Sequence, residues 1–237
     1  MARLRGSWLG LATVVALGVL LVFALVISPP DSRHGDAVRL LYIHVPTAWI
    51  AYLSFFVTAA ASALLLWPRT HRATLDHLAG ASAEFGVVCT GLTLFIGSVW
   101  GREAWGTWWQ WEARLVTTAV MFFLYLGYLA LRRLGGAGSE RRNAIAAVIA
   151  FVQVPIVHFS VTWWRSIHQE GSVFNDRGQV DINDSTMAST LLLGVLAFTL
   201  LFAWCCVMRM RILAVEASTA DAELDAAIRE RIGAVPA

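Results

Sequence analysis

The chain has 237 residues, of which 58% are hydrophobic and only 14% are charged, against about 25% charged residues in an average soluble chain. This composition excludes a soluble globular domain, because too little polar surface is available to cover so large an apolar core. The 18 basic and 16 acidic residues leave a formal charge of +2, which excludes the strong basic field of a nucleic-acid-binding protein.

Six apolar runs are long enough to cross a hydrocarbon core of about 30 Å as helices. They cover residues 8–28, 42–66, 80–100, 115–131, 144–161 and 187–207. The first run lacks a small-residue cleavage site and is longer than a signal-peptide core, so we interpret it as a retained span. The sequence therefore predicts an all-α integral membrane protein, a six-helix bundle over residues 1–213 in contact with membrane lipid.

Arginine is distributed unequally between the loops. The amino terminus, the second and fourth loops and the tail hold 12 arginines, whereas the first, third and fifth loops hold 6. The positive-inside rule then predicts that both termini are cytoplasmic and that the odd-numbered loops lie outside.

Tryptophan is concentrated between the third and fourth spans, where residues 100–111 contain five of the 11 tryptophans. An interfacial aromatic belt is the ordinary explanation, but a belt would be spread over both membrane interfaces. Clustering on one side instead predicts a flat apolar surface for a large planar ligand. The candidate contact residues are Trp105, Trp108, Trp109, Trp111, Trp163 and Trp164.

A helical loop from Gly106 to Arg114 would bring Trp108, Trp111 and Glu112 to one face. Forked guanidinium groups near this face are suited to bind carboxylates of such a ligand. The arginines that flank the tryptophans are Arg102, Arg114 and Arg165.

Two histidines are candidate metal ligands. His44 precedes Pro46, a residue suited to a first helical turn, which predicts an imidazole at the membrane edge. His168 follows Trp164 by four residues, so the two share a helical face if the fifth span continues outward. Two imidazoles at one depth are able to ligate a haem iron from opposite faces. The remaining histidines, which are weaker candidates, are His34, His71, His77 and His158.

The tail, residues 214–237, has soluble character. Ser218 and Asp221 resemble a capping box, and Leu224, Ile228 and Ile232 follow at helical spacing, which together predict a short amphipathic helix in a cytoplasmic tail.

Three separated motifs carry a resemblance to a known family: LYIHVP at 41–46, GSVWGREAWGTWWQWEARL at 97–115, and VPIVHFSVTWWRSIHQ at 154–169. In this order they resemble the tryptophan-rich, haem-handling membrane proteins of cytochrome c biogenesis, specifically the cytochrome c maturation protein C family, also called the haem exporter protein C family. The family motif usually has aspartate where this chain has Glu112, which keeps the charge and lengthens the side chain by one methylene.

The resemblance implies that haem b is held at the outer, periplasmic face of the bacterial inner membrane, with His44 and His168 as iron ligands and the tryptophan loop as a contact surface. It implies delivery of haem to a membrane-tethered haem chaperone. The implied partners are an ABC transporter, made of a membrane subunit and an ATPase, and a small single-span subunit. We expect no enzyme activity in this chain, which lacks the G-x-x-x-x-G-K-[ST] loop of an ATPase.

Two other functions remain open at this point. A membrane cytochrome b subunit would need a second histidine pair near the inner side, where the chain has only His71 and His77. A haem-free permease would need an ionisable residue near the midplane, and Glu84 is the only candidate.

Overall fold

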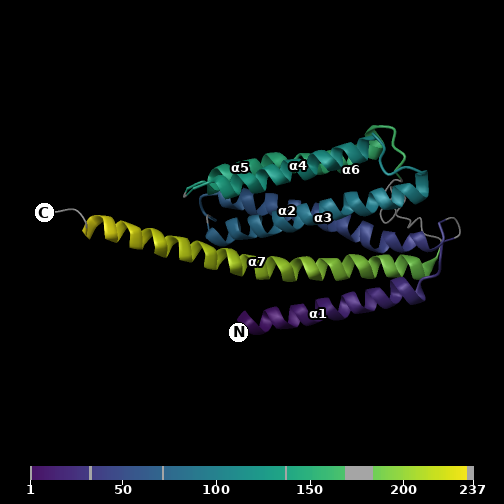
Figure 1. The fold of residues 1–237 in the computed structure, drawn as a ribbon, viewed down its shortest axis with the longest axis horizontal. Coiled ribbons are helices and arrows are strands. Elements are labelled where there is room, and N and C mark those ends of the chain that lie inside the picture. Colours follow the sequence, from purple (N-terminus) through teal and green to yellow (C-terminus); the bar gives the residue numbers. More distant parts are fainter. Residues whose placement is uncertain (1, 32–33, 71, 137, 169–183, 234–237) are drawn as a thin grey trace.

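The structure is a computed structural model that describes residues 2–31, 34–70, 72–136, 138–168 and 184–233. Helices make up nearly all of this part of the chain, with one isolated β-bridge between Asp31 and Gly35. Six helical segments are long and apolar enough to cross a membrane, and they run along one common long axis (Figure 1). The prediction of an all-α, six-span membrane protein is confirmed.

The elements follow one another as α1 (Ala2–Val22), the π-helical turn η1 (Phe23–Ile27), the 3-10 helix η2 (Asp36–Leu40), α2 (Leu41–Leu66), α3 (Ala73–Trp105), α4 (Ala113–Leu134), α5 (Glu140–Phe151), α6 (Gln153–Trp163) and α7 (Ser185–Gly233). Most of the helices extend past the predicted apolar runs, because hydropathy marks only the part of a helix that suits the hydrocarbon layer.

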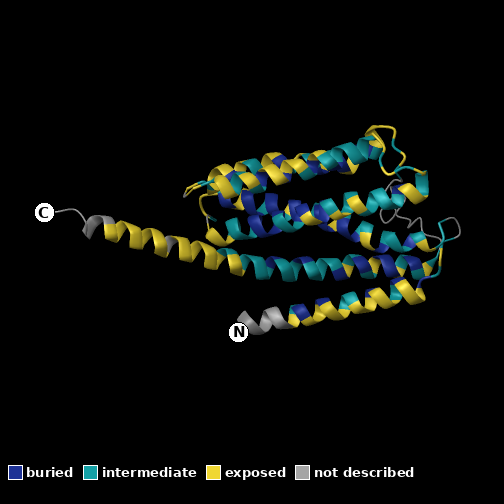
Figure 2. Ribbon diagram, viewed as in Figure 1, coloured by how far each residue is buried: buried dark blue, intermediate teal, exposed yellow. Residues whose placement is uncertain are grey.

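Helix α2 lies at the centre of the bundle and packs against α3, α5 and α7, whereas α1 packs on α7. Close approach of α2 and α3 depends on Gly86, since a Cβ there would lie 2.6 Å from the Phe55 ring. Phe55 in turn stacks on Tyr125 of α4. Figure 2 shows the buried residues inside the bundle and exposed ones on its flanks. Many of the exposed side chains are large and apolar, as a bilayer environment requires.

The two prolines inside helices act differently. Pro155 has no amide to donate to the carbonyl of Phe151, and the fifth span is accordingly interrupted between α5 and α6. Pro46 was expected in a first helical turn, and this is wrong because α2 already begins at Leu41. Gly194 of α7 packs beside Pro46, where a Cβ would lie 3.1 Å from the Tyr42 carbonyl oxygen.

The tail is helical as predicted, but its helix is the continuation of α7 to Gly233 rather than a short helix that begins at Ser218. Ser218 lies inside this helix and donates to the Val215 carbonyl oxygen at 2.8 Å, so it starts no new helix. The reason is that the segment is rich in alanine, the strongest helix former, and has no internal glycine or proline. The side chains of Asp221 and Ile232 lie outside the described residues.

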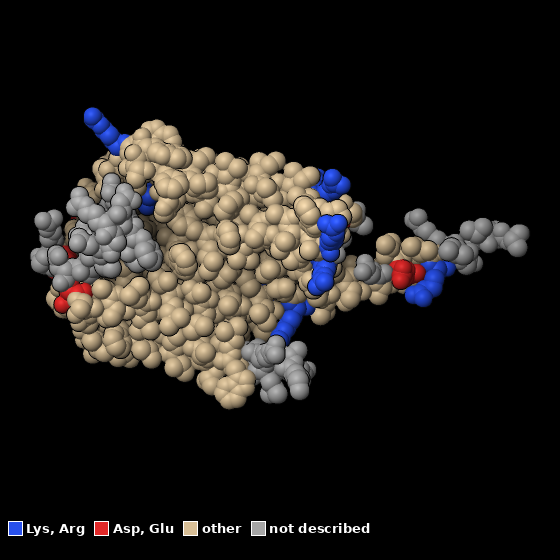
Figure 3. All heavy atoms as spheres, turned by 180° about the vertical axis from the view of Figure 1, so that it is seen from behind, with Lys and Arg blue, Asp and Glu red and all other residues tan. Residues whose placement is uncertain are grey.

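The bundle has two distinct ends. We call the end where α3 is followed by α4 the tryptophan end, and the opposite end, beyond which α7 projects, the tail end (Figure 1). Arginine side chains gather at the tail end in Figure 3. The unequal distribution of arginine between the loops therefore becomes, in the folded bundle, a difference between its two ends.

Candidate functional site

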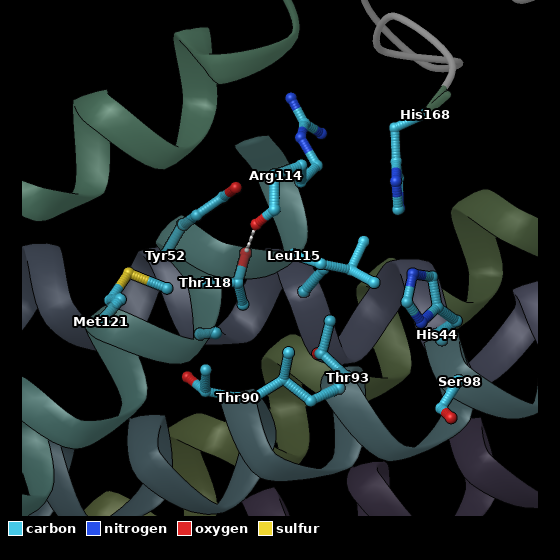
Figure 4. A pocket seen from close by; sticks show the side chains of 14 residues that line it. His44, Tyr52, Thr90, Thr93, Ser98, Arg114, Leu115, Thr118, Met121 and His168 are labelled. Carbon is cyan, nitrogen blue, oxygen red and sulfur yellow. Dashed lines mark hydrogen bonds between the residues drawn. The ribbon is translucent and has the colours of Figure 1, made fainter. Parts of the chain in front are cut away.

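A cavity of about 120 Å³ opens at the tryptophan end between α2, α3, α4 and the segment that follows α6. His44 of α2 and His168 of that segment both line it. Figure 4 shows the two imidazoles directed toward the same space. The structure thus brings together the two histidines that the sequence predicts as ligands. The polar side chains that also line the cavity are Tyr52, Thr90, Thr93, Ser98, Arg114 and Thr118.

His44 projects from the first turns of α2 toward α3. Its Nδ1 atom is buried and has no hydrogen-bond partner in the described part of the chain. Gly97 of α3 makes room for the ring, because a Cβ at that position would lie 2.8 Å from His44 Cε1. A buried ring nitrogen without a partner is costly unless a ligand completes it, so His44 is available to bind one.

His168 is held by side chains from two other segments. Glu112 Oε1 lies 3.3 Å from His168 Nδ1, without full hydrogen-bond geometry, and the Trp105 ring meets the imidazole edge to face at 5.1 Å. Burial lowers the pKa of His168 below its ordinary 6.5, the Glu112 carboxylate opposes this shift, and the Arg114 guanidinium adds to it. The ring is therefore neutral near pH 7 and has a lone pair for a metal.

The predicted helical face of Trp164 and His168 is wrong. Helix α6 ends at Trp163, and Trp164 is extended, with φ −126° and ψ 158°. His168 reaches the cavity because the chain turns back toward α4, rather than because a helix carries it there.

The loop between α3 and α4 is also not helical, contrary to expectation. Gly106 ends α3 with φ 79°, in the left-handed region that favours glycine. Glu112 is extended and caps α4, since its Oε1 accepts a hydrogen bond from the Leu115 amide at 2.7 Å. Its other oxygen, Oε2, accepts from the Ser166 hydroxyl. Glu112 therefore does not share a ligand-facing surface with Trp108 and Trp111.

Two tryptophans are exposed on the loop between α3 and α4, which a hydrogen bond holds to α3. Trp108 and Trp111 are 58% and 85% exposed, although the Ser98 hydroxyl donates to the Trp108 carbonyl oxygen at 2.7 Å. Trp109 packs edge to face on Trp111, and its Nε1 is buried without a partner among the described residues. At the end of α6, Trp163 and the following Trp164 are exposed as well.

The three candidate arginines have different positions. Arg114 lines the cavity, donates to the His158 carbonyl oxygen at 2.9 Å, and keeps a buried Nε without a partner among the described residues. Arg102 instead donates to the Gly106 carbonyl oxygen at the end of α3, and Arg165 is exposed. Of the three, the structure places Arg114 at the cavity.

The weaker candidates lie elsewhere. His34 packs on Trp100, and His158 packs on Tyr52 and Phe159, outside the cavity lining. His77 is in the first turns of α3 at the tail end, and His71 lies outside the described residues. In the described part of the chain, no group of three or more His, Cys, Asp or Glu side chains is placed to hold a metal ion. Two imidazoles do suit an iron whose other ligands are the porphyrin nitrogens.

Glu84, the candidate for a permease site, is bound by Arg209 of α7. The guanidinium donates to both carboxylate oxygens, at 2.6 and 3.0 Å. The charge of Glu84 is therefore explained by an ion pair that links α3 to α7.

Sequence reasoning missed Tyr52, Ser98 and Ser166 as parts of the site. Ser98 and Ser166 stand inside the motifs that carry the family resemblance, which was a usable signal. Their partners, however, are a tryptophan carbonyl and a glutamate that only the folded chain brings near.

Known proteins resemble this chain over most of its length. The family model described as Heme exporter protein C matches residues 1–224. The chain is 39% identical to Heme exporter protein C of Escherichia coli, over 86% of this chain and 81% of that one. It is 37% identical to Heme exporter protein C of Bradyrhizobium diazoefficiens, over 82% and 73%. An Arabidopsis thaliana protein described as a cytochrome c biosynthesis ccmC-like mitochondrial protein is 36% identical over 72% and 62%.

Proposed function

The chain belongs to the haem exporter protein C family, multi-pass membrane proteins of cytochrome c maturation, and on this premise we propose that it binds haem b through His44 and His168. The observation that carries the proposal is that these two histidines, from α2 and from the segment after α6, line one cavity. The buried Nδ1 of His44, which has no partner among the described residues, supports it further.

The size of the cavity indicates where the haem lies. At about 120 Å³ it is smaller than the pockets of about 300–1,000 Å³ that bury small molecules. A porphyrin held by both imidazoles would therefore have most of its surface at the mouth of the cavity, beside the exposed tryptophans, rather than deep among the helices.

The surrounding side chains suit such a ligand. Arg114 has a guanidinium at the cavity with one buried N–H that has no partner among the described residues, which fits a haem propionate. The exposed rings of Trp108 and Trp111 offer stacking area to the porphyrin or to a second protein. Arg102 and Arg165 stay outside the cavity lining, so a contact between either of them and a haem at the mouth stays a prediction.

The role that fits this arrangement is storage and presentation rather than catalysis. Haem held across an open mouth is accessible to a membrane-tethered haem chaperone that docks on the tryptophans. The gathering of arginines at the tail end supports a cytoplasmic tail end and a periplasmic tryptophan end in the bacterial inner membrane. The partners that the family suggests are an ABC transporter, with its membrane subunit and ATPase, and a small single-span subunit.

The test is the visible spectrum and haem content of the detergent-purified protein. We expect about one non-covalent haem per chain with a low-spin spectrum, and a loss or alteration of that spectrum in both His44→Ala and His168→Ala. His77→Ala, a histidine change at the tail end, is the matched control and should leave the haem unchanged. Unaltered haem content and spectra in both site variants would contradict the ligand assignment. A wild type without haem would favour the alternative function, a haem-free permease.

A further inference from the structure

Glu112 joins two parts of the tryptophan end, the start of α4 and the segment after α6. Its side chain is 8% exposed, one oxygen accepts the Leu115 amide at the start of α4, and the other accepts the Ser166 hydroxyl. The oxygen that caps α4 is also the one 3.3 Å from His168 Nδ1. A buried carboxylate with three neighbours of this kind fixes the distance between α4 and the segment that carries His168.

Ser166 completes the connection from the other side. Its hydroxyl donates to Glu112, and its oxygen accepts the backbone amide of His168 at 3.1 Å. The backbone of His168 is thus linked to Glu112 through one serine, and its ring lies 3.3 Å from the same carboxylate. Trp105 closes against the imidazole at 5.1 Å, so the ring is confined from several directions.

The chemistry of such a contact is specific. A carboxylate beside one imidazole nitrogen favours the proton on that nitrogen, which leaves the lone pair on the other. In His168 the nitrogen beside Glu112 is Nδ1, so Nε2 is the atom left for a metal. A carboxylate in this position also raises the basicity of the ligating nitrogen.

We propose that Glu112 and Ser166 are positioning residues for His168, which hold its imidazole with Nδ1 toward Glu112 and present an electron-rich Nε2 to the haem iron. This inference rests on the proposed function, because it assumes that His168 is an iron ligand. It changes the role of Glu112 from the predicted haem contact to a residue that acts through His168.

The experiment compares four variants of the full-length protein in detergent. Glu112→Gln keeps the size of the side chain and removes the charge, whereas Glu112→Asp keeps the charge. Ser166→Ala removes the second tie and leaves the carboxylate's bond to Leu115 in place. Glu103→Gln, at an exposed carboxylate near the end of α3, is the matched control. Each variant is titrated with ferric haem b, and the reduction potential of the complex and the thermal unfolding of the haem-free protein are measured.

For Glu112→Gln we expect haem affinity to fall about 10–100-fold, the usual cost of losing such an outer partner. The reduction potential should rise, because a less basic imidazole stabilises ferric iron less. Ser166→Ala should shift the potential in the same direction by less, Glu112→Asp should retain most of the wild-type potential, and Glu103→Gln should match the wild type.

Two outcomes would overturn the inference that Glu112 and Ser166 position His168. If Glu112→Gln lowers the unfolding temperature but leaves affinity and potential unchanged, Glu112 is only a helix cap and the inference is overturned. If Glu112→Gln does not fold, an unchanged potential in Ser166→Ala overturns it. If the wild type binds haem through both histidines and these variants match it, the proposed function stands and this inference fails. If the wild type binds no haem, both the proposed function and this inference fail.

Discussion

The two ends of the bundle differ in how their charged groups and buried side-chain nitrogens are partnered. At the tail end, Arg132 of α4 donates to both oxygens of Asp76 in α3, each at 2.7 Å. Arg209 of α7 binds Glu84 in the same two-pronged manner. Charges taken out of water are tolerated when they are paired and hydrogen-bonded, and here each pair is closed by the chain itself.

The tryptophan end leaves its nitrogens open. All four buried side-chain nitrogens that lack a hydrogen-bond partner in the described part of the chain lie there: His44 Nδ1, Trp109 Nε1, Arg114 Nε and His168 Nδ1. The tail end thus uses its charged groups to fasten helices, whereas the tryptophan end keeps buried nitrogens without a hydrogen bond among the described residues, and of these His168 Nδ1 faces the Glu112 carboxylate. Stability and ligand binding should therefore respond to separate sets of substitutions.

The largest effect should come from opening the closed pair at the tail end. In Arg132→Met the Asp76 carboxylate is left without its partner, which typically costs about 3–5 kcal/mol. We expect a lower midpoint in thermal or denaturant unfolding of the solubilised protein, with haem per folded molecule unchanged. Arg133→Met, at the neighbouring exposed arginine, should change stability little. A loss of haem at normal stability would show that the two ends are not independent.

Two glycines on α3 provide a matched test of this comparison, with an expected effect of intermediate size. In Gly86→Ala the new methyl group meets the Phe55 ring, and in Gly97→Ala it meets the His44 imidazole. Overpacking of this kind costs about 1–3 kcal/mol, so we expect Gly86→Ala to lower stability. Gly97→Ala should instead displace the imidazole and alter the haem spectrum. Identical spectra and identical unfolding in the two variants would argue against the division between the ends.

The smallest effect should follow loss of the more exposed tail-end pair. Glu84 and Arg209 are each about a third exposed, with 32% and 30% of their side-chain surface accessible, so solvent screens their attraction. Arg209→Gln should cost about 1 kcal/mol or less, measured by the same unfolding experiment, and should leave haem binding intact. A shift as large as that of Arg132→Met would mean that this pair is as strongly desolvated as the other.

The six spans and the tryptophan-rich connection were predictable because hydropathy and residue clustering are local properties. An apolar run of about 20 residues has one stable state in lipid, a helix that satisfies its own backbone hydrogen bonds. Helix ends were less predictable. Ser218 resembled the first residue of a new helix, yet the helix of the last span continues through it. The reason is that the alanine-rich residues on both sides of Ser218 favour helix.

The sequence by itself determined that the chain is a membrane bundle, because apolar length suffices for that. It also made His44 and His168 candidate ligands, because of their positions along the chain and the motifs around them. Only the tertiary structure decided that the two histidines line one cavity, that Arg114 reaches it while Arg102 does not, and that Glu112 faces His168. The physical reason is that such contacts join segments far apart in the chain. Their geometry depends on how α2, α3, α4 and the segment after α6 pack together, which no local pattern encodes.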